Sequence, residues 1–196
     1  MNRREFFTAG AVATGGVLLA GSAGAATLLQ SEGPIARAKA ALDRHAGVIP
    51  NRDVVGIADF GLNSATPRFH LVDLRNGRMD SFLVAHGRGS DPAHTGWLQR
   101  FSNEPGSEAT SAGAFLTKDV YVGAHGRSRR LQGLDAGNDQ AEARGIVVHG
   151  AWYVNQALAQ RGAIGRSQGC FAFSEDQIGQ IIERLGPGRL ILAAKA

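Results

Sequence analysis

The chain of 196 residues contains 21 Lys and Arg against 17 Asp and Glu, a net charge of +4, and 43% of its residues are hydrophobic. This length suits one domain with a sizeable core and is too short for two ordinary domains. The basic residues are scattered, and their one cluster, GRSRR at 126–130, has no interleaved aromatic residues, so no nucleic-acid partner is predicted.

Residues 1–25 are typical of an export signal. Arg3 and Arg4 precede a long uncharged stretch that ends in small residues, Ala23-Gly24-Ala25, which suit a signal peptidase. The paired arginines followed by Glu5 resemble a twin-arginine signal, with the Sec route as the alternative. Cleavage near Ala25 leaves 19 basic and 16 acidic residues and no stable membrane span. We therefore predict a protein of the periplasm or cell envelope.

The next elements are a helix and a series of short strands. Residues 26–52 predict an N-terminal helix and linker, with an exposed helix over 33–47, and residues 53–196 predict one folded domain. Asn76-Gly77 predicts a two-residue type I′ hairpin and hence antiparallel pairing. Composition predicts strands at 54–60, 68–74, 79–85, 113–116, 120–122, 146–149 and 189–193.

The remaining segments are loops and a second helix. Residues 87–113 predict a long loop of the kind that is usually functional, and 128–144 is another polar stretch. Ser174 is predicted to cap a helix, with Gln177 in the capping-box position, and Gly186 ends it. The predicted fold class is mostly β, an antiparallel β-sandwich or barrel with a few peripheral helices.

Cys170 is the only cysteine. An unpaired thiol in an oxidising compartment is a liability unless it is buried or used. A buried, inert cysteine is the simplest interpretation, and the neighbouring residues argue against it.

The segment GRSQGC at 165–170 fits two chemistries. Its first five residues match the G-x-S-x-G nucleophile elbow of serine hydrolases, in which a strand precedes the serine and the histidine follows it. No histidine follows Ser167, and the preceding segment NQALAQRGAIGR has no strand character. Ser167 is therefore predicted to support the loop and not to act as the nucleophile.

Cys170 has the residues that a thiol nucleophile needs. His149 ends the apolar run GIVVHG, where it can act as a base toward Cys170 while its second nitrogen donates to a carbonyl such as that of Gly150. Gly169 lets the backbone bend sharply and brings N–H groups close to a developing oxyanion.

These residues resemble the signature of the L,D-transpeptidases, cysteine enzymes that cross-link bacterial peptidoglycan. His149-Gly150 is followed after 16 residues by Ser167-x-Gly169-Cys170, and TSAGAF at 110–115 is similar to a segment that the family carries before its histidine. The resemblance covers about residues 53–193 and is strongest to a divergent branch of murein L,D-transpeptidase catalytic domains.

The resemblance implies acyl transfer through a Cys170 thioester on the peptide stems of peptidoglycan, sensitivity to carbapenems and no cofactor. Trp152 and Tyr153 are predicted to line the cleft. Arg166, Ser111 and Gly113 complete the implied substrate-binding set. The chain has Phe171-Ala172 where the family has an apolar residue and then Arg or Asn, so Arg166 or Arg144 is expected to substitute.

Three alternatives remain open at this stage. An L,D-carboxypeptidase would use water in place of the acceptor amine, and an inactive wall-binding β-domain would keep only the fold. A zinc hydrolase would use histidines in loops or at strand ends, although no compact metal motif is present. The histidines in question are His86, His94, His125 and His149, with Asp91 between the first two.

Overall fold

The structure is a computed structural model that describes residues 33–195. The predicted export signal lies outside these residues. None of the helices between residues 33 and 195 has the length and apolar character needed to span a bilayer.

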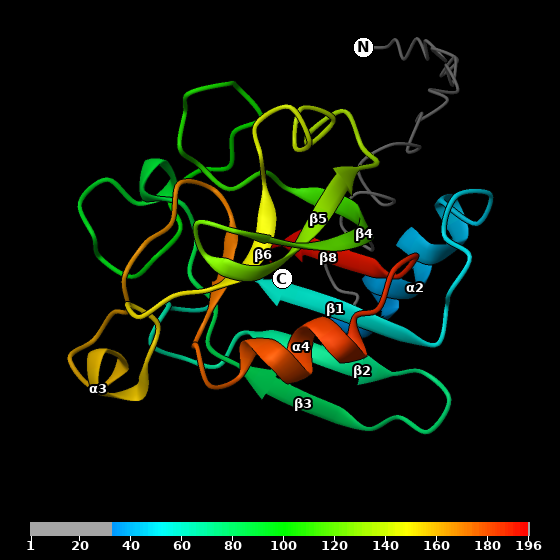
Figure 1. Cartoon of the computed structure of the whole chain (residues 1–196), viewed down its shortest axis with the longest axis horizontal. Coiled ribbons are helices and arrows are strands. Elements are labelled where there is room, and N and C mark those ends of the chain that lie inside the picture. The colour runs from blue at the N-terminus through cyan, green and yellow to red at the C-terminus, as the bar shows by residue number, and fades with distance from the viewer. Residues whose placement is uncertain (1–32, 196) are drawn as a thin grey trace, which may run out of the picture. The chain divides into compact units, whose positions relative to one another are not determined.

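Eight strands form one mixed sheet (Figure 1). In their order across the sheet they are β3 (Met79–Phe82), β2 (Phe69–Asp73), β1 (Val54–Asp59), β8 (Leu190–Ala194), β4 (Gly113–Gly123), β5 (Gly126–Gly133), β6 (Val147–Gly150) and β7 (Phe171–Phe173). The consecutive strands β1, β2 and β3 pair antiparallel, as predicted.

Two pairings are parallel, which corrects the prediction of a purely antiparallel sheet. β8 returns to the middle of the sheet and runs parallel to β1, and β7 runs parallel to β6. Parallel neighbours need long connections. Most of the chain connects β1 to β8, and residues 151–170 connect β6 to β7. The mostly β fold with a few peripheral helices is confirmed.

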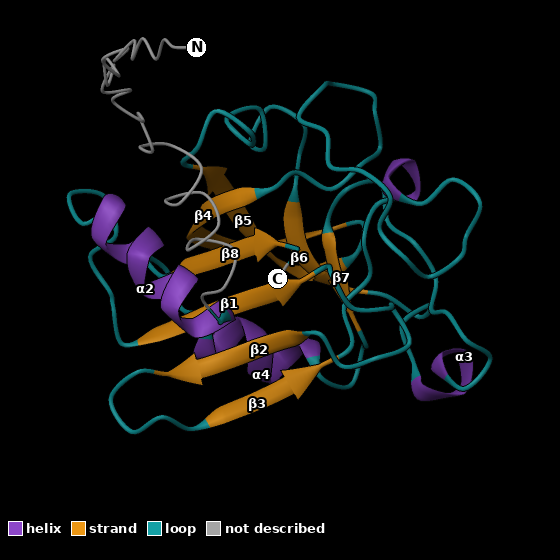
Figure 2. Cartoon of the chain, turned by 180° about the vertical axis from the view of Figure 1, so that it is seen from behind, coloured by secondary structure: helices purple, strands orange, loops and turns teal. Residues whose placement is uncertain are grey.

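Helices cover both faces of the sheet (Figure 2). All six residues of β1 are buried, because successive side chains of a strand point to opposite faces and each face packs on a different cluster. Helix α2 (Pro34–Arg44) packs on one face and helix α4 (Ile178–Arg184) on the other. The helix predicted over 33–47 is therefore confirmed in position, but it is not simply exposed, since Ala38, Ala41 and Leu42 are buried against the sheet.

The sheet curls until its two ends meet. The rings of Phe69 in β2 and Phe173 in β7 lie 4.7 Å apart, edge to face. Ala85, just beyond β3, forms an isolated antiparallel bridge with Ala172 of β7. The core therefore lies inside a nearly closed sheet, and the segment after β3 reaches the strand that follows Cys170.

Five local elements differ from the predictions. Residues 113–123 form the single strand β4 with a bulge between Thr117 and Val120, where two strands were predicted. β5 overlaps the start of the polar stretch at 128–144, where no strand was predicted, and the three-residue β7 was not predicted. The helices η1 (Arg88–Ser90) and α3 (Gln156–Ala159) were also missed.

Two turn motifs take other forms. Gly77 has a φ of 75° but Asn76 does not have a positive φ, so the hairpin is not type I′; the Asp73 carboxylate accepts the Arg75 N–H and builds a longer turn. Ser174 donates to Asp176 instead of capping, and α4 begins at Ile178, after Gln177.

Candidate active site

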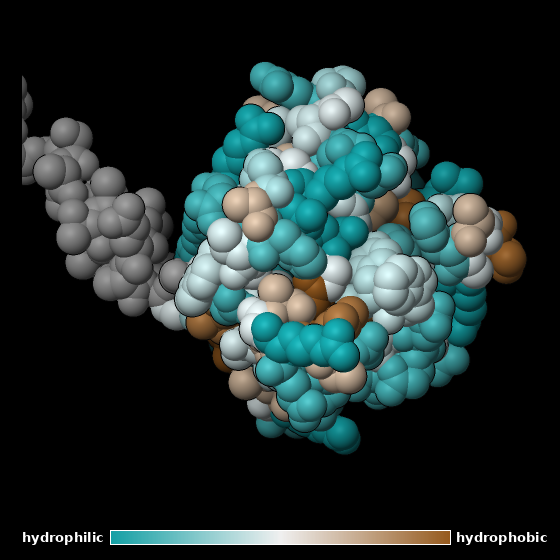
Figure 3. Space-filling model, turned by 90° about the vertical axis from the view of Figure 1, so that its left-hand side faces the viewer, coloured by the Kyte–Doolittle hydropathy of each residue, from teal (hydrophilic) through white to brown (hydrophobic). Residues whose placement is uncertain are grey.

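Loops at one side of the sheet surround a cavity of about 920 Å³. Figure 1 shows these loops gathered at the left, and Figure 3 views the molecule from that side, where hydrophilic residues predominate. The lining includes Tyr121 and His125 near the β4–β5 turn, Arg144, His149, Arg166, Gln168 and Cys170. The predicted base and the predicted nucleophile therefore share one cavity.

The register of β6 and β7 explains why His149 and Cys170 meet. Val148 pairs with Phe171, so extending the parallel register by one residue sets Cys170 beside Val147. His149 is two residues beyond Val147, and side chains two apart on a strand project from the same face. The two groups are 21 positions apart in the sequence and reach the same edge of the sheet.

Cys170 ends a loop that Ser167 holds in shape. The Ser167 hydroxyl accepts the Gly169 N–H at 3.1 Å and donates to the Cys170 carbonyl at 2.7 Å. Gly169 has a φ of 117°, which favours glycine. The loop is tied to the segment after β3, because Ser167 N–H donates to His86 O and Arg88 N–H donates to Ser167 O.

The ring of His149 has a defined tautomer. Its Nδ1 lies 2.8 Å from the Gly150 carbonyl oxygen, which can only accept, so Nδ1 carries the proton in the neutral ring and Nε2 is free to act as a base. Burial lowers the pKa of His149, the Gly150 carbonyl opposes this effect and His125 adds to it. The ring is therefore neutral over most of the physiological range.

The thiol of Cys170 is also neutral in the resting protein. Burial raises its pKa, while the Val147 N–H and the charge of Arg144 oppose the rise. Its sulfur lies 3.6 Å from the Gly145 carbonyl oxygen. The arrangement is thus a neutral thiol and a neutral imidazole in one cavity, so a thiolate would form only when the thiol loses its proton.

His125 lines the cavity, whereas the sequence suggested it only as a possible metal ligand. Its ring stacks on that of His149 with the centroids 4.3 Å apart and the planes 23° apart. It lies between β4 and β5, in a turn that leaves its side chain exposed. The only sequence signal was a histidine between two glycines in a hairpin turn, which does not identify its neighbour.

The predicted substrate-binding residues divide into two groups. Arg166 and Tyr153 line the cavity. Trp152 is 74% exposed and touches Tyr153 edge to face, at a ring distance of 5.8 Å. Ser111 is buried, and its hydroxyl accepts a hydrogen bond from Arg144. Gly113 faces Asp135, whose carboxylate a Cβ added at Gly113 would meet. Neither residue lines the cavity.

Two of the four histidines named for zinc, His86 and His94, have separate partners. Buried His86 contacts Arg68 through Nδ1 at 2.8 Å, and burial together with Arg68 lowers its pKa to about 4. His94 contacts the Ile164 carbonyl through Nε2 at 2.8 Å. Within residues 33–195 no group of three or more His, Cys, Asp or Glu side chains is arranged to hold a metal ion.

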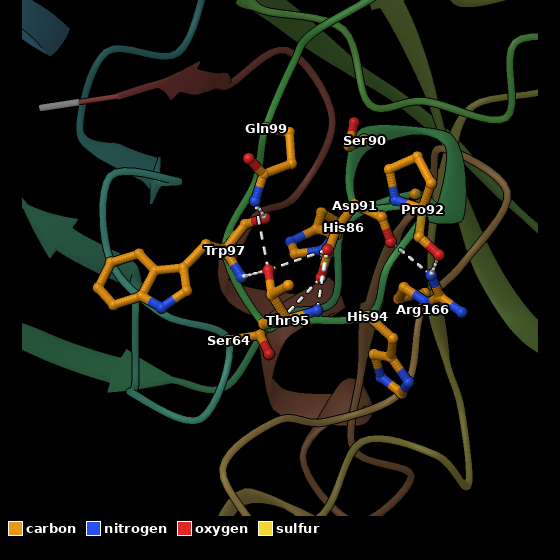
Figure 4. Close-up of polar contacts among 12 residues, drawn as sticks. Ser64, His86, Ser90, Asp91, Pro92, His94, Thr95, Trp97, Gln99 and Arg166 are labelled. Carbon is orange, nitrogen blue, oxygen red and sulfur yellow. Dashed lines mark hydrogen bonds and ion pairs between the residues drawn. The ribbon is translucent and has the colours of Figure 1, made fainter.

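Asp91 organises the loop beside the cavity (Figure 4). Its buried carboxylate accepts the N–H and hydroxyl of Thr95 and the N–H of Gly96, at 2.8 to 3.0 Å. Its carbonyl and that of Pro92 accept hydrogen bonds from Nη1 of Arg166, as Figure 4 also shows. This segment of the long loop therefore holds Arg166 at the cavity, beside the Ser167 turn.

A polar cavity that holds a thiol and an imidazole at adjoining strand ends contains the groups that acyl transfer uses. The sequence model of the L,D-transpeptidase catalytic domain matches residues 35–193, so the chain belongs to this family. The family modifies peptidoglycan by acyl transfer. The resemblance stated from the motifs is confirmed.

The solved structures that match the chain have low identity to it. An L,D-transpeptidase from Mycobacterium smegmatis is 15% identical, with a TM-score of 0.45 and coverage of 72% of this chain and 58% of the other. One from Xylanimonas cellulosilytica is 18% identical, with a TM-score of 0.43 and coverage of 81% and 69%. The chain thus spans less than two thirds of the length of the mycobacterial enzyme. A comparison with curated proteins gives no match.

Proposed function

We propose that the protein is a peptidoglycan L,D-transpeptidase that forms cross-links between peptide stems through a thioester on Cys170. The observation that carries the proposal is that His149 and Cys170 line one cavity at the adjoining ends of β6 and β7. The family supplies the substrate class.

In the first half-reaction, Nε2 of His149 takes the thiol proton as the sulfur attacks the carbonyl of the L-configured centre of a diamino acid in a tetrapeptide stem. The tetrahedral intermediate collapses, the C–N bond breaks, and His149 returns the proton to the departing D-alanine. A thioester on Cys170 and free D-alanine are the products.

In the second half-reaction, a side-chain amine of another stem attacks the thioester. His149 accepts a proton from the amine and returns it to the sulfur as the C–S bond breaks. Water in place of the amine would give the carboxypeptidase reaction. The acceptor therefore decides between cross-linking and trimming.

The negative charge that develops on the carbonyl oxygen needs N–H donors. We assign the Cys170 N–H to this role. The Gly169 N–H already donates to Ser167 Oγ, so it would have to exchange that acceptor for the oxyanion. Ser167 and Gly150 act indirectly, through the turn and through the ring of His149.

Arg166 and Tyr153 are the proposed substrate-binding residues inside the cavity, with Trp152 at its rim. Arg166 is fixed by two carbonyl oxygens at Nη1 and offers a positive charge to the carboxylates of the stem. Residues 1–25 are proposed as the export signal, and the catalytic domain is proposed to include helix α2 together with residues 53–196, because the family model begins at residue 35 and α2 packs on the sheet. The site of action is then the periplasm or cell envelope.

One observation favours the inactive wall-binding alternative, because burial raises the pKa of Cys170 and a high thiol pKa is typical of an inert cysteine. Intact-protein mass spectrometry after incubation with a carbapenem separates the two. An active cysteine gains the mass of the drug, and an inert one does not.

Mass spectrometry of muropeptides after incubation with the protein tests the reaction itself. New cross-linked dimers support transpeptidation, and shortened stems without dimers support trimming. The Cys170→Ala variant should lose both activities, whereas Ser167→Ala should retain a reduced rate. Full activity of Cys170→Ala would exclude the thioester route.

A further inference from the structure

The two terminal nitrogens of Arg144 are engaged by the loop that faces them. Its Nη1 donates to the Ser102 carbonyl at 2.8 Å and to the Ser111 hydroxyl at 2.6 Å. Its Nη2 donates to the Ser107 hydroxyl at 3.2 Å and to the Ala109 carbonyl at 2.6 Å. Four N–H groups of the fork are thus used within the protein, and no bidentate site is left on the terminal nitrogens for a substrate carboxylate.

The guanidinium also lies against the backbone of the nucleophile loop. A Cβ added at Gly169 would fall 2.8 Å from the Ala109 carbonyl oxygen and 3.3 Å from Arg144 Nη2. Gly169 precedes Cys170 directly, so Arg144 fixes residues 102–111 against the residue that sets the position of the thiol.

The position of Arg144 places a fixed positive charge in the same cavity as the reacting sulfur. Arg144 lines the cavity with Cys170, its charge lowers the pKa of the thiol, and the thiolate in turn raises the pKa of Arg144. The other titratable or charged groups around the cavity are His149, His125 stacked on it, Tyr121, Tyr153, Arg166 and the ion pair of Arg88 with Glu108.

We propose that Arg144 is the positioning residue of the nucleophile loop and the fixed charge that stabilises the Cys170 thiolate, filling the role left open by Phe171-Ala172 after the Gly-Cys pair. The inference rests on the proposed function for its use in catalysis. Arg166, held at one nitrogen only, is left to meet the substrate. The two arginines therefore divide two tasks, electrostatic support and substrate binding.

The test measures the thiol itself and needs no substrate. The rate of alkylation of Cys170 by iodoacetamide is followed against pH in the wild type, Arg144→Met, Arg144→Lys and Arg166→Met. Removal of the charge in Arg144→Met should raise the thiol pKa by about one unit, which lowers the alkylation rate near neutral pH about tenfold. Arg144→Lys keeps the charge and should retain the wild-type thiol pKa despite lower thermal stability. Arg166→Met should also retain it.

A merely structural role for Arg144 predicts a different pattern. Both Arg144 variants would then lose stability while the thiol pKa stays unchanged, and that result overturns the proposal. If Arg144→Met does not fold, Arg144→Gln replaces it as the uncharged variant, because its amide can still donate hydrogen bonds to the loop. An unchanged thiol pKa in Arg144→Gln overturns the proposal, and so does a shift of about one unit in Arg144→Lys, which keeps the charge.

Turnover assays add a second readout. In Arg144→Met, kcat should fall more than KM rises, and in Arg166→Met the rise in KM should dominate. The reverse split would assign substrate binding to Arg144 and overturn the division of tasks. A protein whose thiol follows the expected pattern but makes no cross-links would contradict the proposed function and leave the inference about the thiol intact.

Discussion

Replacing Gly169 by alanine tests how the nucleophile loop is held. The residue has a φ of 117°, and a Cβ there would lie 2.8 Å from the Ala109 carbonyl oxygen and from Ile146 Cδ1. The backbone strain costs about 1–3 kcal/mol, and overpacking costs a further 1–3 kcal/mol or so. The expected loss in the free energy of unfolding is therefore about 2–6 kcal/mol, summed from these two effects.

Two other glycines separate these contributions. Gly162 has a φ of 103° and open space around its Cα, so Gly162→Ala should show the strain alone, about 1–3 kcal/mol. Gly179 lies in α4 without a positive φ or a near neighbour, and Gly179→Ala should stabilise the protein by up to about 1 kcal/mol.

Urea denaturation gives the free energies, and thermal melting should follow at about 2–4 °C per kcal/mol for a chain of this size. Carbapenem acylation of Gly169→Ala should also slow, because the displaced loop carries Cys170. If Gly169→Ala is no less stable than Gly162→Ala, close packing against Ala109 does not hold the loop. Wild-type stability of Gly169→Ala would refute the whole argument.

Three further outcomes are expected. Because burial lowers the pKa of His149 from its usual 6.5, the acid limb of the pH–acylation profile should have its midpoint below pH 6.5. A midpoint above pH 6.5 would contradict the buried environment of His149. His125→Phe keeps a ring stacked on His149 but removes the imidazole that lowers the pKa of His149, so the acid limb should move to higher pH. His125→Ala should move the limb in the same direction and also slow acylation. An acid limb that stays in place in both variants would exclude an effect of His125 on His149. Asp91→Ala leaves the donors of Thr95 and Gly96 without their carboxylate, so the free energy of unfolding, measured in urea, should fall by about 1–3 kcal/mol. Asp91→Asn keeps an acceptor oxygen and should lose less stability. Equal losses in the two variants would mean that the negative charge of Asp91 is essential.

The sequence predicted most of the β elements because they carry local signals. Val54–Asp59 and Val147–Gly150 are apolar runs bounded by polar or turn residues, and both form strands. β5 has no such signal. Its Arg129 is 4% exposed and donates to the carbonyls of Lys118 and Ile182, so tertiary partners make a strand of a polar segment.

The candidate site was predictable only in part, for a similar reason. The motif positions His149 and Cys170 stand out in the sequence, and they share the cavity. Arg144 reaches the loop of Cys170 only in the folded chain, where it lies against Gly169. His125 reaches the ring of His149 through the turn between β4 and β5. Ser111 and Gly113, chosen by motif similarity, contact Arg144 and the Asp135 region instead.

The parallel pairing of β6 with β7 has a consequence for how the protein can diversify. The sheet register holds His149 and Cys170 together, so the length of the crossover between them is free to change. Its tip at Gln160 to Gly162 is exposed, while Val154 and Ile164 on either side are buried anchors. Doubling a flexible loop costs only about 0.6 kcal/mol in closure entropy. Insertions at this tip can therefore supply new recognition surface beside an unchanged catalytic pair.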